Sequence, residues 1–182
     1  MAALKKSPKP TAYHEAGHAV IGREMHLRVI SCSIIPQADT LGRCDFDIRW
    51  KNFHPDWDTS SKTRDRIERT IMVKLAGPEA EAIHHGSHEW LPGHESDTRH
   101  VVNLAGYVTG SAEETGAYLD WLTVRTRSML GQPILWAAVD ALALELLAHG
   151  ELGTQSVREI MSDATRSWLD RRRNRGGVFA PD

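Results

Sequence analysis

The pattern of apolar and polar residues divides the chain into several helices and one short hairpin. Apolar residues at helical spacing predict helices over about 10–27, 59–85, 96–110, 113–130, 132–149 and 154–173. Two other segments predict strands: 29–35 is rich in β-branched residues, and apolar and polar residues alternate in 41–50. Because they are joined by a short polar turn, they predict an antiparallel hairpin with one solvent-facing side. The expected fold is therefore mainly helical, in the α+β class, with one small β-hairpin.

Glycine and proline interrupt two of the predicted helices. Gly17 destabilises the helix over 10–27 by about 1 kcal/mol relative to alanine, which indicates that another element passes close to the helix at this point. Gly77 and Pro78 predict a break or a restart within the helical segment 59–85.

Length, charge and the two cysteines narrow the class of protein. The 182 residues and a formal charge of −2 fit a single domain over 10–173, with flexible tails at 1–9 and 174–182, and give no reason to expect nucleic acid as a partner. The sequence lacks both the roughly 20 apolar residues of a membrane span and the apolar segment of a signal peptide, so we expect a cytoplasmic protein. Cys32 and Cys44 are expected to be free thiols, although they could face each other across the hairpin.

The residues most informative about function are His14-Glu15-Ala16-Gly17-His18, an H-E-x-x-H motif inside the first predicted helix. Residues four apart lie on one face of a helix, so both imidazoles can bind the same metal ion. Glu15 flanks that face and is placed to accept a proton from water rather than to bind the metal. A catalytic zinc site normally has three protein ligands and an open fourth position, so the motif requires one further ligand.

Spacing alone does not identify the third ligand. A longer zinc motif places a glycine and a third histidine shortly after the second, but this chain has Ile21 and Glu24 at those positions. Seven donor residues lie further along the chain, namely His84, His85, His88, Glu89, His94, Glu95 and Asp97. Asp97 could instead cap the following helix, since Ser-Asp before an apolar run is a usual helix start.

Several segments resemble the peptidase domain of FtsH-type zinc metalloproteases, which are AAA+ membrane proteases, and the last of them, 136–147 followed by Glu151-Leu152, resembles the closing helix and the turn after it. Residues 13–20 resemble the family's zinc motif, in which alanine and glycine fill the two middle positions, and 33–36 followed by Leu41-Gly42 are similar to its strand, turn and Leu-Gly edge strand. Residues 75–81 are similar to its Gly-Gly-Arg-x-Ala-Glu segment, with Ala76 for the first glycine and Pro78 for the arginine. Ser96-Asp97 falls where the family has its third zinc ligand, and the resemblance continues in one order from about residue 10 to 165.

This resemblance implies a set of site residues. His14, His18 and Asp97 would bind Zn²⁺, and Glu15 would act first as base and then as acid. His94 is the substitute if Asp97 is not the third ligand. Glu79 or Glu81 could hold a ligand imidazole in place, with Glu81 preferred, or could belong to a solvated helix face.

The predicted hairpin bears on substrate binding. An exposed edge strand near a zinc site can take up an extended peptide through main-chain hydrogen bonds. The candidate residues are Leu41, Gly42, Arg43 and Cys44. The alternative is a strand that only covers the core.

The sequence thus predicts a stand-alone zinc endopeptidase that cleaves flexible or unfolded polypeptides without its own ATPase module. A separate ATPase partner and a homo-oligomeric ring are both compatible with the resemblance. The alternatives are a regulatory protease with one substrate, and a binding or regulatory module with little turnover. Glu15 favours an enzyme, because a structural zinc site has no need for a base.

Overall fold

The computed structural model describes residues 7–37, 40–48, 53–87 and 95–174. For residues 95 and 96 it describes the backbone alone. Its helices are α1 (Lys9–Glu24), α2 (Ser61–His85), α3 (Glu95–Ala105), α4 (Ala112–Leu130), α5 (Pro133–His149) and α6 (Thr154–Asn174). Its strands are β1 (Val29–Ser33), β2 (Arg43–Phe46) and β3 (Glu151–Gly153). The described part of the chain is thus mainly helical with one small antiparallel sheet, which confirms the predicted fold class.

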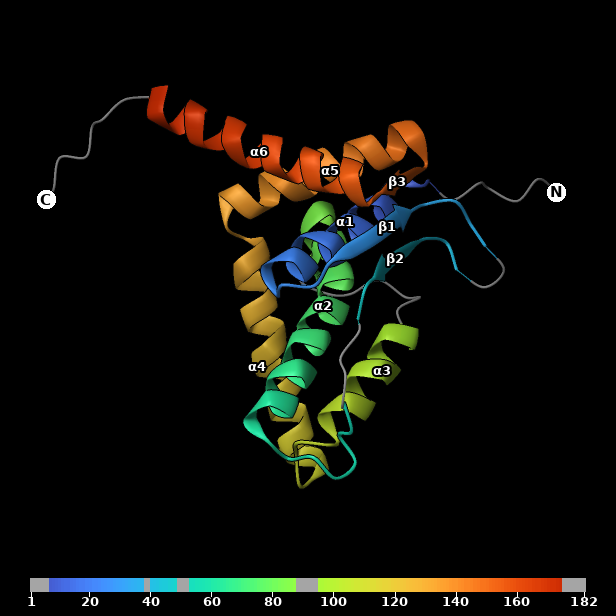
Figure 1. Ribbon diagram of the computed structural model, residues 1–182, viewed down its shortest axis with the longest axis vertical. Helices are drawn as coiled ribbons and strands as arrows, with labels where there is room; N and C mark the ends of the chain where they lie inside the picture. Colours follow the sequence, from blue (N-terminus) through green and yellow to red (C-terminus); the bar gives the residue numbers. More distant parts are fainter. Residues whose placement is uncertain (1–6, 38–39, 49–52, 88–94, 175–182) are drawn as a thin grey trace, which may run out of the picture.

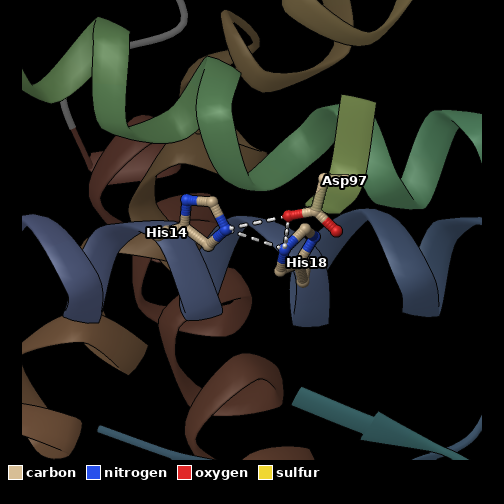
Figure 2. Close-up of side chains that lie close together, drawn as sticks. All are labelled: His14, His18 and Asp97. Atoms are coloured by element: carbon tan, nitrogen blue, oxygen red, sulfur yellow. Dashed lines mark hydrogen bonds and ion pairs between the residues drawn. The ribbon is translucent and has the colours of Figure 1, made fainter. Parts of the chain in front are cut away.

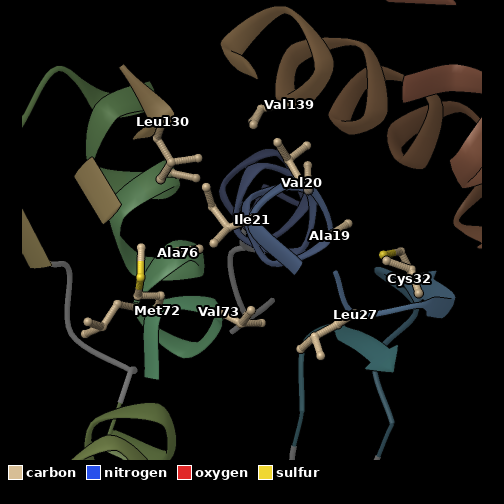
Figure 3. Close-up of a cluster of buried hydrophobic side chains, with 14 of the residues drawn as sticks. Ala19, Val20, Ile21, Leu27, Cys32, Met72, Val73, Ala76, Leu130 and Val139 are labelled. Carbon is tan, nitrogen blue, oxygen red and sulfur yellow. The ribbon is translucent and has the colours of Figure 1, made fainter. Parts of the chain in front are cut away.

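Helix α1 is the central element (Figure 1). It packs against α2 on one side and α5 on another, and the small sheet lies beside it. Of residues 12–22, all but His14 are buried. Figure 3 shows Val20 and Ile21 of α1 among apolar side chains from α2, α4 and α5. Burial of one such aliphatic side chain stabilises the fold by about 1.5–3 kcal/mol. The helix that carries the motif residues is therefore fixed in place by its buried apolar side chains.

Gly17 lies where α1 and α2 cross. A Cβ atom at this position would lie 2.5 Å from the Ala76 carbonyl oxygen and 2.5 Å from the Ala80 Cβ. The expectation that another element passes close to Gly17 is therefore confirmed. Small residues on both helices allow this approach, which brings the motif on α1 against α2.

Helix α2 continues through Gly77 and Pro78, so the predicted break was wrong. Proline removes one helical hydrogen bond and costs about 3 kcal/mol in a helix interior. Here both residues are buried, with Leu75 and Ala80 buried on either side of them. Packing of this stretch against α1 offsets the local cost, and such long-range packing is not visible in the sequence.

The sheet has the strand order β2-β1-β3, with both pairs antiparallel, so the predicted hairpin is confirmed. Cys32 pairs directly with Cys44, and their Sγ atoms are 2.9 Å apart. Both are free thiols, as expected. Strand β3 was not predicted, because three residues are too few for an alternating pattern to stand out.

Helix α1 begins at Lys9 and α6 ends at Asn174. The limits of a single domain over 10–173 stay a prediction. The predicted flexible tails lie mostly outside the described residues.

Within the described residues, no single helix has the length and apolar composition needed to cross a membrane. Helices α4 and α5 taken together meet these two criteria, but they are bent by 80° at the break between them.

Candidate metal centre

Three donor side chains from two helices converge beside α2 (Figure 2). The Nε2 atoms of His14 and His18 on α1 are 3.0 Å apart, and Oδ2 of Asp97 on α3 lies 3.5 Å from the first and 3.8 Å from the second. Two donors that each lie 2.0–2.1 Å from a tetrahedral ion are about 3.3 Å apart. The three donor atoms therefore have the spacing that one tetrahedral metal ion requires.

Hydrogen bonds to α2 orient both imidazoles. His18 Nδ1 donates to the Val73 carbonyl oxygen at 2.7 Å, and His14 Nδ1 donates to Glu81 Oε2 at 3.3 Å. A carbonyl and an ionised carboxylate only accept hydrogen bonds, so in each ring Nδ1 carries a proton. When a ring is neutral, as a metal ligand has to be, the lone pair of its Nε2 then faces the other donor atoms of the cluster. Glu81 thus contacts the imidazole of His14, whereas the sequence interpretation assigned Glu81 or Glu79 to a ligand imidazole without saying which one.

Gly77 provides the space for the two imidazoles. A Cβ at this position would lie 2.5 Å from His14 Nε2 and 2.5 Å from His18 Nε2. Any other residue would push both rings out of position. The sequence interpretation considered Gly77 as a helix breaker and as part of the segment similar to Gly-Gly-Arg-x-Ala-Glu, but did not connect it with the space for the imidazoles. A clue was present in the spacing, because Lys74, Gly77 and Glu81 fall on one face of α2.

Asp97 is the third residue of α3, inside its first turn rather than at its cap. Its carboxylate also pairs with Lys74, whose Nζ is 3.2 Å from Asp97 Oδ1. Burial opposes ionisation of this carboxyl, but the hydrogen bond from His14 and the positive charge of Lys74 outweigh burial and lower its pKa. Asp97 is therefore an anion at neutral pH, as a metal ligand has to be.

The other candidate ligands are away from the cluster or outside the described residues. His84 stacks on Tyr13 with ring centroids 3.7 Å apart, and His85 is exposed at the end of α2. His88, Glu89 and His94 lie outside the described residues, and only the backbone of Glu95 is described. Glu79, the alternative to Glu81, is buried and instead accepts two hydrogen bonds from the half-buried Arg127, at 2.6 and 3.0 Å.

Glu15 lies beside the cluster and beneath the start of strand β2. Its side chain is buried, and a Cβ on Gly42 would lie 2.6 Å from Glu15 Oε1. Burial raises the pKa of Glu15 to about 7. Strand β2 forms one edge of the sheet, and Leu41 and Arg43 are exposed there. The candidate edge strand and the candidate base are thus in direct proximity.

The two histidines have different proton affinities in the metal-free protein. Burial lowers the pKa of His14, but hydrogen bonds to Asp97 and Glu81 and the charge of Glu15 outweigh burial and raise it to about 9. Burial and the charge of His14 lower the pKa of His18 to about 3. At neutral pH the metal-free site therefore holds one imidazolium and one neutral imidazole.

Metal binding should therefore release protons. At pH 7.5 the His14 imidazole of the metal-free protein is charged, whereas a metal ligand has to be neutral, so we expect at least about one proton to be released for each Zn²⁺ bound. Calorimetric titration in buffers of different ionisation enthalpy measures this number. Below the raised pKa of His14, affinity should fall as pH falls, because protons compete with the ion. A binding heat that is independent of the buffer would contradict this protonation state.

Two imidazoles and one carboxylate could hold a metal ion, and a buried glutamate lies beside them. A structural zinc site usually has four protein ligands, whereas a catalytic one has three and keeps a position open. The sequence profile of peptidase family M41 matches residues 1–111, which include α1, α2 and α3 and therefore all four of these side chains. The chain belongs to peptidase family M41. This assignment confirms the resemblance to FtsH-type peptidase domains.

Curated relatives agree with this assignment. The chain is 32% identical over 107 residues to the ATP-dependent zinc metalloprotease FtsH of Rickettsia typhi and, equally, to that of Rickettsia conorii, which covers 58% of this chain and 16% of each relative. It is 34% identical over 102 residues to the ATP-dependent zinc metalloprotease FtsH of Heterosigma akashiwo, which covers 55% of this chain and 14% of the relative. The chain therefore matches only a small part of these relatives. Residues 112–165, which the sequence resemblance also included, lie beyond the family match.

Proposed function

We propose that this chain is a zinc-dependent endopeptidase that hydrolyses flexible or unfolded polypeptides. The observation that carries the proposal is the convergence of His14, His18 and Asp97, with the buried carboxylate of Glu15 beside them. Membership of a peptidase family supports the same reaction, and the relatives described above are named as zinc metalloproteases.

The donor set suits Zn²⁺, which binds imidazole nitrogen and carboxylate oxygen in a tetrahedral site. Bound there, zinc would act as a Lewis acid that polarises a peptide carbonyl and lowers the pKa of water. His14, His18 and Asp97 would hold the ion through the three atoms that face one another, with Glu81 and the Val73 carbonyl fixing the two rings.

Glu15 would move the proton. Its carboxylate would accept a proton from the attacking water and then give it to the leaving amine. Burial under Gly42 leaves this carboxylate poorly solvated, which raises its affinity for the proton. The reaction requires a group that acts first as a base and then as an acid. A carboxyl whose pKa is raised to about 7 by burial can do both near neutral pH.

Strand β2 would supply the binding surface for the substrate. An extended peptide that pairs with an edge strand is held by main-chain hydrogen bonds, which demand little of its sequence. Leu41, Gly42, Arg43 and Cys44 begin this edge, and Gly42 is adjacent to the proposed base. A peptide paired there would pass close to Glu15. Only a flexible or unfolded segment can adopt such an extended conformation.

Cleavage of casein, an unfolded protein, tests the proposal. We expect the zinc-loaded chain to cleave fluorescently labelled casein, a chelator to stop cleavage, and added Zn²⁺ to restore it. Because casein needs no unfolding, the assay does not depend on a partner ATPase. A protein with one equivalent of bound zinc that cuts neither casein nor other unfolded chains would contradict the peptidase proposal and favour a binding module.

Gly42→Ala tests the link between β2 and the base. The new methyl group would lie 2.6 Å from both Glu15 Oε1 and Thr11 Cγ2, so either the carboxylate or the strand has to move. We expect kcat/KM for casein to fall by about 100-fold, the scale that follows from misplacing a catalytic group by about 1 Å, with zinc still bound. Gly153→Ala, on β3 of the same sheet, is the matched control because a Cβ there meets nothing within 4 Å. Equal activity of the two variants would show that Gly42 does not set the position of Glu15.

A further inference from the structure

Lys74 is a charged side chain at the site to which the proposed reaction assigns no role. It stands on α2, and its Nζ lies 3.2 Å from Asp97 Oδ1. The other carboxylate oxygen, Oδ2, is the one that lies 3.5 Å from His14 Nε2 and 3.8 Å from His18 Nε2. The two oxygens of Asp97 thus have different partners: one faces the metal-binding imidazoles and the other faces an ammonium group.

This division matters because a carboxylate can bind a metal ion through one oxygen or through both. A catalytic zinc site keeps one position open for water or substrate. If both oxygens of Asp97 bound the ion, the second would take up space at that position. An ammonium group on Oδ1 competes with the metal for this oxygen and favours binding through Oδ2 alone.

We propose that Lys74 is a positioning residue that keeps Asp97 a one-oxygen ligand and thereby leaves the fourth metal position open. The inference rests on the proposed zinc site of His14, His18 and Asp97. Lys74 follows directly after Val73, whose carbonyl oxygen accepts the hydrogen bond from His18. One turn of α2 therefore orients two of the three ligands.

The environment of this ion pair distinguishes it from an ordinary surface pair. Exposed pairs of mobile side chains contribute little to stability. The Asp97 side chain is only 15% exposed and stands on a helix, whereas the Lys74 side chain is 40% exposed. The carboxylate is thus largely withdrawn from water, whereas the lysine side chain remains partly in contact with water. Replacement of Lys74 should therefore change the coordination of the ion without removing a buried part of the core.

Cobalt substitution tests the inference, because Co²⁺ in a four-coordinate site absorbs visible light more strongly than Co²⁺ in a five-coordinate site. We expect a strong visible spectrum from the cobalt-loaded wild type. In Lys74→Met and Lys74→Ala, Oδ1 is free to bind the ion, so the absorption should weaken, and kcat/KM of the zinc form should fall by about tenfold. Lys74→Arg keeps the cation and should retain the wild-type spectrum. Lys62→Met is the matched control, because Lys62 is an exposed lysine near the start of the same helix.

The outcomes separate this inference from the proposed function. A wild type that binds neither Zn²⁺ nor Co²⁺ contradicts the metal site itself. If the wild type binds both ions, the metal site is supported. If Lys74→Met and Lys74→Ala then give the same strong cobalt spectrum as Lys62→Met, the role proposed for Lys74 is wrong. A weak, five-coordinate spectrum from the wild type also overturns it, because the fourth position would then not be held open in the manner described.

Discussion

Glu15→Gln is expected to lower the rate of casein cleavage by about 10²–10⁴-fold, the range that general acid–base catalysis contributes. Glutamine has nearly the same shape as glutamate but cannot accept the proton of the attacking water. Glu15 is not among the three side chains whose donor atoms converge, so zinc should remain bound with one equivalent per chain. Loss of activity with the metal retained separates the proposed base from a metal ligand. Cleavage rates and zinc content are measured on the same preparations.

Glu24→Gln is the matched control for this variant. Glu24 is the last residue of α1, the same helix, and is half-buried, whereas Glu15 is buried. We expect wild-type cleavage from it. If Glu15→Gln cleaved casein as fast as Glu24→Gln, the proton would have to be accepted by another group, and the role proposed for Glu15 would be wrong.

Gly77→Ala is expected to lower zinc affinity by at least about 100-fold, the upper end of what loss of ligand orientation costs. The added methyl group would lie 2.5 Å from the Nε2 atoms of both His14 and His18, much closer than nonbonded atoms approach. The rings fill the space that the methyl group needs, so they have to turn away from the metal position. Alanine favours a helix by about 1 kcal/mol over glycine, so thermal stability should not report this damage. Competition with a chromophoric chelator measures the affinity.

Gly116→Ala provides the comparison, because Gly116 also lies in a helix and a Cβ there meets nothing within 4 Å. It should bind zinc as the wild type does and be slightly more stable. Wild-type zinc affinity in Gly77→Ala would show that the imidazoles are not arranged around Gly77 as described, and the proposed metal site would need a different geometry.

The sequence could predict the helical part of the site because the information is local. His14 and His18 are four residues apart, so a helix alone places them on one face. The position of Asp97 depends on the packing of α3 beside α1 and α2, which no local pattern reveals. Spacing left seven candidate donors, and only the resemblance to FtsH-type peptidases selected among them.

The wrong and missing predictions also concern features that depend on tertiary packing. The Gly77-Pro78 pair looks like a helix break in isolation, yet α2 continues because this stretch is buried against α1. Strand β3 exists because it pairs with β1, which comes more than a hundred residues earlier in the chain. The proximity of Gly77 and Lys74 to the candidate ligands also arises from tertiary packing. Helical spacing along α2 could have placed both residues on the face of Glu81, but it could not have shown that this face meets the candidate ligands.

A crystal structure of the zinc-loaded protein, with the ion located by anomalous scattering at the zinc absorption edge, tests the central claim most directly. The account predicts one ion within about 2.2 Å of His14 Nε2, His18 Nε2 and Asp97 Oδ2, with Glu15 beside it but not bound to it. An ion held by a different third ligand, such as His94, or no ion between the two histidines, would contradict the account.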